Sequence, residues 1–164
     1  MPFTPFHFGP GLLLKSLAPS RFSFVAYAAS QVVIDVESGY FLATRQWPVH
    51  RTLHTFLVGS LVGAATGLVI ATVGRRLPRW DTGPPARRAE LQMTSAVSGG
   101  TIGGIVHSLL DGVMHPDIRP FLPFTESNPL LGQVSLSTLY WGCVLTGVAG
   151  LALLWRPRRR QPTA

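Results

Sequence analysis

Long apolar stretches alternate along this chain with short polar segments that are rich in proline. Residues 50–74, 91–115 and 133–155 are each long enough for a helix that crosses a bilayer, which needs about 20 apolar residues. Residues 22–40 form a fourth candidate span, whose last turns carry acidic side chains. The pattern predicts a bundle of membrane-spanning helices.

The first 19 residues hold only one short apolar piece, which prolines interrupt. We expect a tilted or half-length helix there that begins near His7. We also expect the segment to be kept, because it lacks the basic start and long apolar core of a cleavable signal peptide. The predicted fold class is therefore all-α, a polytopic membrane helical bundle with four spans plus a short N-terminal helix. One integral membrane domain would cover residues 1–156, and residues 157–164 would form a basic cytoplasmic tail.

Glycine recurs at four-residue spacing in two of the predicted spans. Such spacing gives a smooth helix face on which another helix can pack closely in a membrane. The glycines concerned are Gly59, Gly63 and Gly67 in one span, and Gly99, Gly100, Gly103 and Gly104 in the other. We expect close packing at these faces, either within the chain or between two copies in a homo-oligomer.

The composition favours a membrane protein and argues against two other classes. Charged residues make up 13% of the chain, about half of the roughly 25% in globular domains. A net charge of +7 would suit a nucleic-acid binder, but the arginines cluster at the ends of apolar stretches, so we expect no nucleic-acid partner. Cys143 is the single cysteine, which excludes an internal disulfide framework.

The distribution of Lys and Arg predicts which side of the membrane each loop faces, because these residues concentrate on the cytoplasmic side. Loop 75–90 has five arginines and the segment after Trp155 has four. Four spans put both segments on the same side as Lys15 and Arg21, so that eleven of the fourteen basic residues are cytoplasmic. The C-terminus is then cytoplasmic too.

In this topology the side chains that bind metals gather at the outer ends of the spans. Five of the seven acidic residues lie there with four histidines, and His7 joins them if the first short helix runs inward. Ionisable groups cost roughly 2.5–3.5 kcal/mol each at the middle of a membrane helix, so several at one depth need mutual compensation. A divalent cation would provide it, because carboxylates and neutral imidazoles are its natural ligands.

Two short motifs contribute most of the histidines. His107, Asp111 and His115 recur at i, i+4 and i+8, on one face of a helix. Because this helix should end before Pro116, we expect His115 and Asp117 to orient ligands or to anchor the loop.

The second motif, His50-x-x-x-His54, is expected on the first turns of span 50–74. It has the spacing of the zinc histidines in HExxH metalloproteases. Arg51 stands where those enzymes have their catalytic glutamate, so that assignment fails.

The predicted centre combines these residues by role. The expected metal ligands are His7, Asp35, His50, His54, His107 and Asp111. The catalytic candidates, as ligand or as general base for a metal-bound water, are Asp35, Glu37 and Asp111. Arg51 and Arg119 would bind an anionic group such as phosphate, or else offset the local carboxylates. A ligand set without thiolates favours zinc, with manganese and iron as alternatives, and more than four ligands indicate two metals or outer carboxylates that orient histidines.

The chain resembles the membrane-bound metal-dependent hydrolases grouped with YdjM, small bacterial inner-membrane proteins whose family label also mentions LexA. The resemblance rests on MPFTPFH at the start, Asp35-x-Glu37, HRTLHT at 50–55, HSLLDGVMHPD at 107–117 and RPFLPFTESNPL at 119–130. It covers about residues 1–130. Glu37 stands where the family usually has a second Asp, and Thr55 where it usually has Ser. The resemblance implies a multi-span protein of the bacterial inner membrane with a metal site.

Two classes of function follow from this picture. The first is a hydrolase at the outer face that cleaves phosphoester or ester bonds of an amphiphile, such as a lipid or a lipid-linked substrate. The alternative is a non-catalytic metal-binding protein, related to transport or using the metal as a staple between helices. The cytoplasmic halves of the spans offer few polar side chains, which argues against a transport path. In either case the lipid bilayer is the main expected partner.

Overall fold

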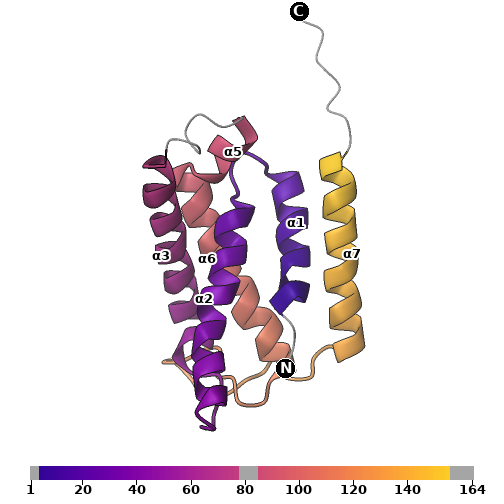
Figure 1. The fold of residues 1–164 in the computed structure, drawn as a ribbon. Helices are drawn as coiled ribbons and strands as arrows, with labels where there is room; N and C mark the ends of the chain where they lie inside the picture. The colour runs from indigo at the N-terminus through magenta and orange to yellow at the C-terminus, as the bar shows by residue number, and fades with distance from the viewer. Residues whose placement is uncertain (1–3, 78–84, 156–164) are drawn as a thin grey trace, which may run out of the picture.

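The computed structural model describes residues 4–77 and 85–155, and all regular structure in these ranges is helical (Figure 1). The elements in chain order are η1 (Thr4–His7), α1 (Phe8–Leu17), α2 (Phe24–Ala43), η2 (Thr52–His54), α3 (Phe56–Arg75), α5 (Pro85–Glu90), α6 (Met93–Met114) and α7 (Leu136–Trp155). The all-α class and the short N-terminal helix are confirmed. The predicted basic tail at 157–164 lies outside the described residues.

Four long helices match the four predicted spans in order, namely α2, α3, α6 and α7. Of these, α3 and α7 are long and apolar enough to cross a membrane. The other two have similar lengths but are less apolar, and they carry Asp35, Glu37, His107 and Asp111. Figure 1 shows the helices side by side, with α7 at the edge of the bundle. Helix α6 packs against both α2 and α3, and α7 packs against α1.

The helix in the predicted span 50–74, α3, begins later than the sequence pattern suggested. Thr55 caps α3, because its side-chain oxygen accepts a hydrogen bond from the backbone N–H of Val58 at 3.1 Å. The three residues before this cap form the 3₁₀ turn η2. His50 and His54 therefore precede α3, and the prediction that they occupy its first turns is wrong.

The glycines of α3 and α6 face one another inside the chain, which confirms the predicted close packing. A side chain at Gly63 would collide with the carbonyl of Gly100, and one at Gly104 would collide with the carbonyl of Gly59. The two backbones are therefore in direct contact. This contact fixes α6 against α3 along most of their length.

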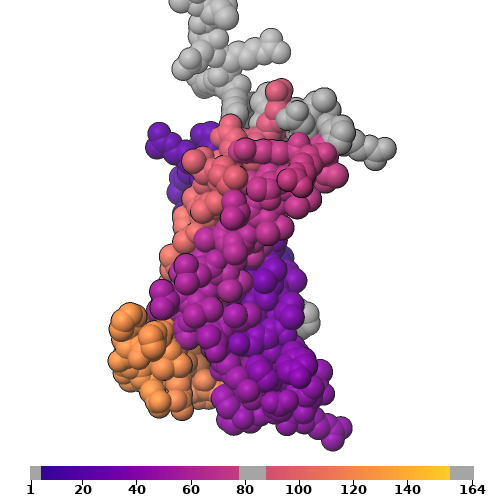
Figure 2. All heavy atoms as spheres, turned by 90° about the vertical axis from the view of Figure 1, so that its left-hand side faces the viewer, coloured from indigo at the N-terminus to yellow at the C-terminus, as the bar shows by residue number. Residues whose placement is uncertain are grey.

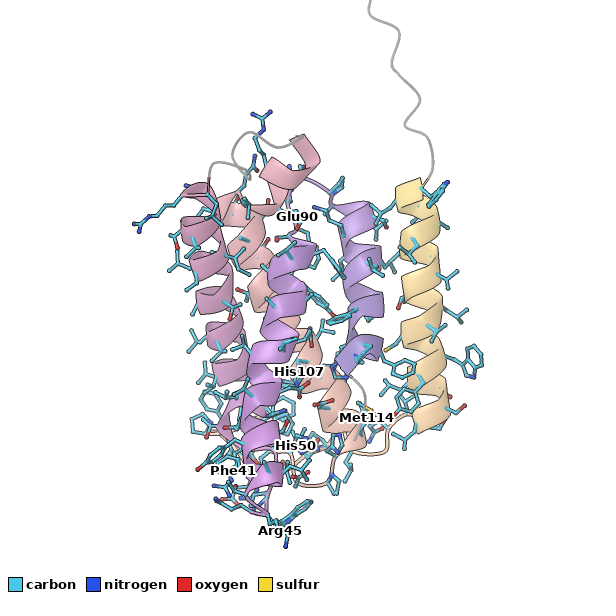
Figure 3. The ribbon with its side chains drawn as sticks, in the orientation of Figure 1. Phe41, Arg45, His50, Glu90, His107 and Met114 are labelled. Carbon is cyan, nitrogen blue, oxygen red and sulfur yellow. The ribbon has the colours of Figure 1, made fainter. Side chains whose placement is uncertain are left out.

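The two ends of the bundle differ in their polar residues. At one end Glu90 pairs with Lys15 and accepts hydrogen bonds from the Ser23 hydroxyl at 2.9 Å and the Val25 N–H at 3.2 Å. We call these four residues the Glu90 cluster. His50 and His107 lie toward the other end, as the labels in Figure 3 show. The loop after α6 gathers at that end, beside the end of α2 (Figure 2).

Candidate metal centre

Four segments that are distant in sequence bring the candidate ligands together at one end of the bundle, where Figure 3 labels His50 and His107. Helix α2 contributes Asp35, η1 contributes His7, and the segment before α3 contributes His50 and His54. Helix α6 contributes His107 and Asp111, and His115 directly follows that helix. We call these seven residues the histidine cluster. All six predicted ligands belong to it.

Asp35, His54, His107 and Asp111 each place one ligand atom within 4.8 Å of the others. We call them the Asp35 group. The His107 Nε2 atom lies 3.2 Å from Asp111 Oδ2 and 3.5 Å from Asp35 Oδ1. The His54 Nε2 atom lies 3.9 Å and 3.8 Å from the same two oxygens. Ligand atoms around a tetrahedral zinc ion are about 3.3–3.4 Å apart, given zinc–nitrogen bonds of about 2.0–2.1 Å. The group therefore has nearly the spacing of a metal site.

The second nitrogen of each imidazole in the Asp35 group is held by an acceptor. His54 Nδ1 lies 3.2 Å from Glu37 Oε2, and His107 Nδ1 lies 2.8 Å from Gln31 Oε1. The Gln31 amide is itself oriented, because its Nε2 donates to the Gly103 carbonyl at 3.0 Å. These acceptors put the proton of a neutral imidazole on Nδ1 and leave the Nε2 lone pair facing the carboxylates. This is how proteins orient histidines that bind a metal.

Several buried polar atoms at this end have no hydrogen-bond partner. Within residues 4–77 and 85–155, the buried side-chain atoms without one are both nitrogens of His7, Nε2 of His54, His107 and His115, Oγ of Ser108 and Oδ1 of Asp111. Leaving such an atom unsatisfied costs roughly 1–3 kcal/mol. A cation in the Asp35 group would give the Nε2 atoms of His54 and His107 a partner, so the residues present fit a divalent metal ion.

Glu37 lies just outside the Asp35 group and organises the segment before α3. Its carboxylate accepts hydrogen bonds from the backbone N–H groups of Arg51 and Leu53, each at 3.0 Å, besides its contact with His54. Three donors on one carboxylate fix the loop that carries His54. The structure thus places Glu37, a catalytic candidate, against Nδ1 of His54, where it orients the imidazole.

The two candidate substrate-binding cations lie away from the cluster. The Arg51 guanidinium stacks over the Phe41 ring at 3.5 Å from its centroid, and its Nε donates to the Pro48 carbonyl. Arg119 pairs with Glu126 at 2.6 Å, and both of these side chains are mostly exposed. Neither arginine lines the cavity described next.

A cavity of about 440 Å³ opens beside the histidine cluster. Asp35, His50 and Asp111 line its polar part, and Leu42 and Trp47 line its apolar part. Trp47 is 71% exposed, so the apolar wall continues to the protein surface. A molecule with a polar group and an apolar tail would match both walls.

The charge state of His54 depends on whether a metal is bound. Burial lowers the pKa of this imidazole, but the charge of Asp35, whose Oδ1 lies 3.8 Å from Nε2, and the hydrogen bond to Glu37 outweigh burial and raise the pKa above its usual 6.5. The raised pKa favours the protonated imidazole, whose charge the neighbouring carboxylates stabilise. A metal ion would have to displace that proton.

Sequence reasoning missed Gln31 and Tyr27. Gln31 is fully buried and orients His107, and the Tyr27 hydroxyl donates to the His7 carbonyl at 2.7 Å, which holds η1 against α2. The one available signal for Gln31 was an amide inside an apolar stretch. No family model, no curated protein and no solved structure matches the chain. The resemblance to the YdjM-like hydrolases therefore stays a prediction.

Proposed function

We propose that this protein is a membrane-bound metal-dependent hydrolase that acts on phosphoester or ester bonds of amphiphilic substrates. One observation carries the proposal. The buried Nε2 atoms of His54 and His107 face Asp35 and Asp111 without a hydrogen-bond partner, while their Nδ1 atoms are held by neighbouring acceptors. Zinc is the metal we propose first, with manganese and iron as alternatives.

A bound metal ion would supply a water molecule of lowered pKa and would polarise the bond to be cleaved. Hydrolysis adds one water molecule across the ester bond and releases an acid and an alcohol. Asp35 is the candidate for accepting the proton of the attacking water, because its side chain is 29% exposed and lines the cavity. Asp111, whose side chain is 3% exposed, is better suited to hold the metal.

The apolar wall of the cavity supports an amphiphilic substrate, such as a lipid or a lipid-linked molecule. Leu42 and Trp47 continue from the polar cluster to the surface, where an acyl or prenyl chain could lie in the bilayer. The cluster lies at the end of the bundle, which gives a substrate headgroup access from the membrane surface.

We further propose that α2, α3, α6 and α7 all cross the bacterial inner membrane, with the histidine cluster at the outer face and the C-terminus in the cytoplasm. Exposed apolar side chains on α3 and α7 support contact with lipid, including Leu61, Val69, Leu145 and Leu151. Nucleic acid is not a proposed partner. The glycine faces of α3 and α6 are buried within the chain, so a homo-oligomer would need another face.

A non-catalytic role has support from one feature. The ligands of the Asp35 group come from α2, η2 and α6, so a metal ion would crosslink three separate elements. A metal that serves only as such a staple would stabilise the fold without turnover. This alternative predicts metal-dependent stability in the absence of hydrolysis.

The test is metal analysis and hydrolysis by protein purified in detergent. Amphiphilic phosphomonoesters, phosphodiesters and carboxyl esters would be offered after loading with zinc or manganese, to wild type and to His107→Ala. We expect at least one substrate class to be cleaved by wild type only. Metal in wild type with no cleavage of any class would support the staple, and equal metal content in both proteins would reject the site.

The topology has its own test. Reporter fusions after Leu77 and after Pro157 should report a cytoplasmic position, and a fusion near Thr125 should report an external one. An external signal after Leu77 would place the histidine cluster on the cytoplasmic face instead.

A further inference from the structure

We propose that His50, His115 and Asp111 bind a second divalent cation, so that the Asp111 carboxylate bridges two metal ions. This inference rests on the proposed function, because the first ion is the one in the Asp35 group. The three residues offer one ligand atom each within 4.8 Å of one another. Asp111 is the only residue shared by the two sets of ligands in the described part of the chain.

The two histidines are arranged as ligands. Their rings stack with centroids 4.3 Å apart and planes 28° apart, so that both imidazoles can present a nitrogen to the same point. The Nε2 atom of His115 is buried and has no hydrogen-bond partner. Ring packing alone does not explain why this nitrogen is buried without a partner, since that costs free energy.

His50 is oriented in the same way as His54. Its Nδ1 lies 3.0 Å from Asp117 Oδ1, and the other oxygen of Asp117 accepts hydrogen bonds from the N–H groups of Val49 and His50 at 3.0 and 3.1 Å. Asp117 therefore orients the imidazole of His50, as Glu37 orients that of His54.

Asp111 presents its two oxygens to different histidines, as a bridging carboxylate does. Oδ2 faces His107 at 3.2 Å and His54 at 3.9 Å. Oδ1 faces His7 Nε2 at 3.3 Å and is buried without a hydrogen bond. His7 Nε2 is therefore a further possible metal ligand beside Oδ1. Oδ1 is therefore open to a second cation while Oδ2 faces the first.

A metal pair also narrows the substrate class. Two-metal sites are built to stabilise both the attacking and the leaving oxygen of an in-line displacement at phosphorus. His50, His115 and Asp117 line the cavity beside the Asp35 group, so a phosphoryl group there could contact both ions. Among the substrates proposed above, we therefore favour phosphoesters.

The experiment counts metal ions in the full chain, purified in detergent, loaded with Mn²⁺ and freed of excess ion. We expect about two ions per chain in wild type, and an electron paramagnetic resonance spectrum of an exchange-coupled pair. His115→Ala and His50→Ala should each reduce the content to about one ion and convert the spectrum to that of isolated Mn²⁺. His107→Ala should lose the other ion.

Wild type with one ion and an uncoupled spectrum would overturn the second site, even where hydrolysis is observed. So would a content of two ions that His115→Ala and His50→Ala leave unchanged. The wild-type spectrum needs no variant, so it decides the question if the alanine variants fail to fold. A coupled pair without hydrolysis of any ester would support the second site while rejecting the hydrolase.

Discussion

The two ends of this bundle both bury polar groups, but they differ in whether the protein satisfies them. In the Glu90 cluster the carboxylate has three donors, from Lys15, Ser23 and Val25. In the histidine cluster, carboxylates and imidazoles lie within 4 Å of one another and still leave Nε2 atoms without hydrogen bonds. In a polar cluster that serves structure alone, the polar groups satisfy one another's hydrogen bonds. One that serves binding keeps matched ligand atoms open toward a common point.

Among substitutions at the two ends, Asp111→Asn should cause the largest loss of metal affinity. The amide removes a charged ligand oxygen from the centre of the histidine cluster, so we expect metal affinity to fall more than about 100-fold. Equilibrium dialysis with zinc or manganese would measure it. Glu126→Gln, which neutralises an exposed carboxylate near the same end, is the matched control and should bind metal as wild type does. Unchanged affinity in Asp111→Asn would remove the basis for the centre.

A smaller effect should follow from changing the residues that orient the histidines. Glu37→Gln and Gln31→Ala leave every proposed ligand in place but weaken the hold on His54 and His107. Loss of such partners typically costs about 10–100-fold in metal affinity, which competition with a coloured chelator would measure. An effect as large as that of Asp111→Asn would make Glu37 a ligand itself.

Metal affinity should also depend on pH. Because the pKa of His54 is raised in the folded protein, metal binding must displace a proton below that pKa. We expect affinity to fall by about tenfold per pH unit for each proton displaced as the pH decreases. The metal-free protein should show the opposite trend in stability. The raised pKa stabilises it fully below the unfolded value, and this contribution is lost as the pH rises through the folded pKa. Thermal unfolding with and without metal would reveal the two opposite slopes.

The smallest effect on metal binding should come from the Glu90 cluster. Glu90→Gln removes a paired charge at the far end of the bundle, so we expect about 1–3 kcal/mol of lost stability and no change in metal affinity. Unfolding in detergent and dialysis measure the two quantities on one preparation. A change in metal affinity there would show that the two ends are coupled.

The sequence predicted the helices and the end at which the ligands gather, for identifiable reasons. Apolar stretches of span length define the helices. His107 and Asp111 lie on one face of α6 as their spacing requires, and α6 ends at Met114, before Pro116. These features depend on local pattern, which a sequence carries directly.

The remaining details depend on contacts that no local pattern encodes. His50 and His54 have helical spacing, but the cap at Thr55 starts α3 after them. Gln31 became identifiable only when α6 placed His107 beside it. Arg51 carries the right charge for an anion site, yet the loop before α3 stacks it on Phe41. Residue type indicated which side chains could bind a metal or an anion, and tertiary packing determined which of them lie at the site.

The contact between α3 and α6 has a consequence for how the chemistry of this protein can vary. Gly104 lies three residues before His107 on α6, and it touches backbone rather than a compressible side chain. A metal ion tolerates errors of only about 0.2 Å in its ligand distances. One added methyl group at Gly104 would therefore act as a spacer that moves His107 relative to its partner ligands. Under the proposed function, the choice of metal ion would therefore depend in part on residues that have no side chain.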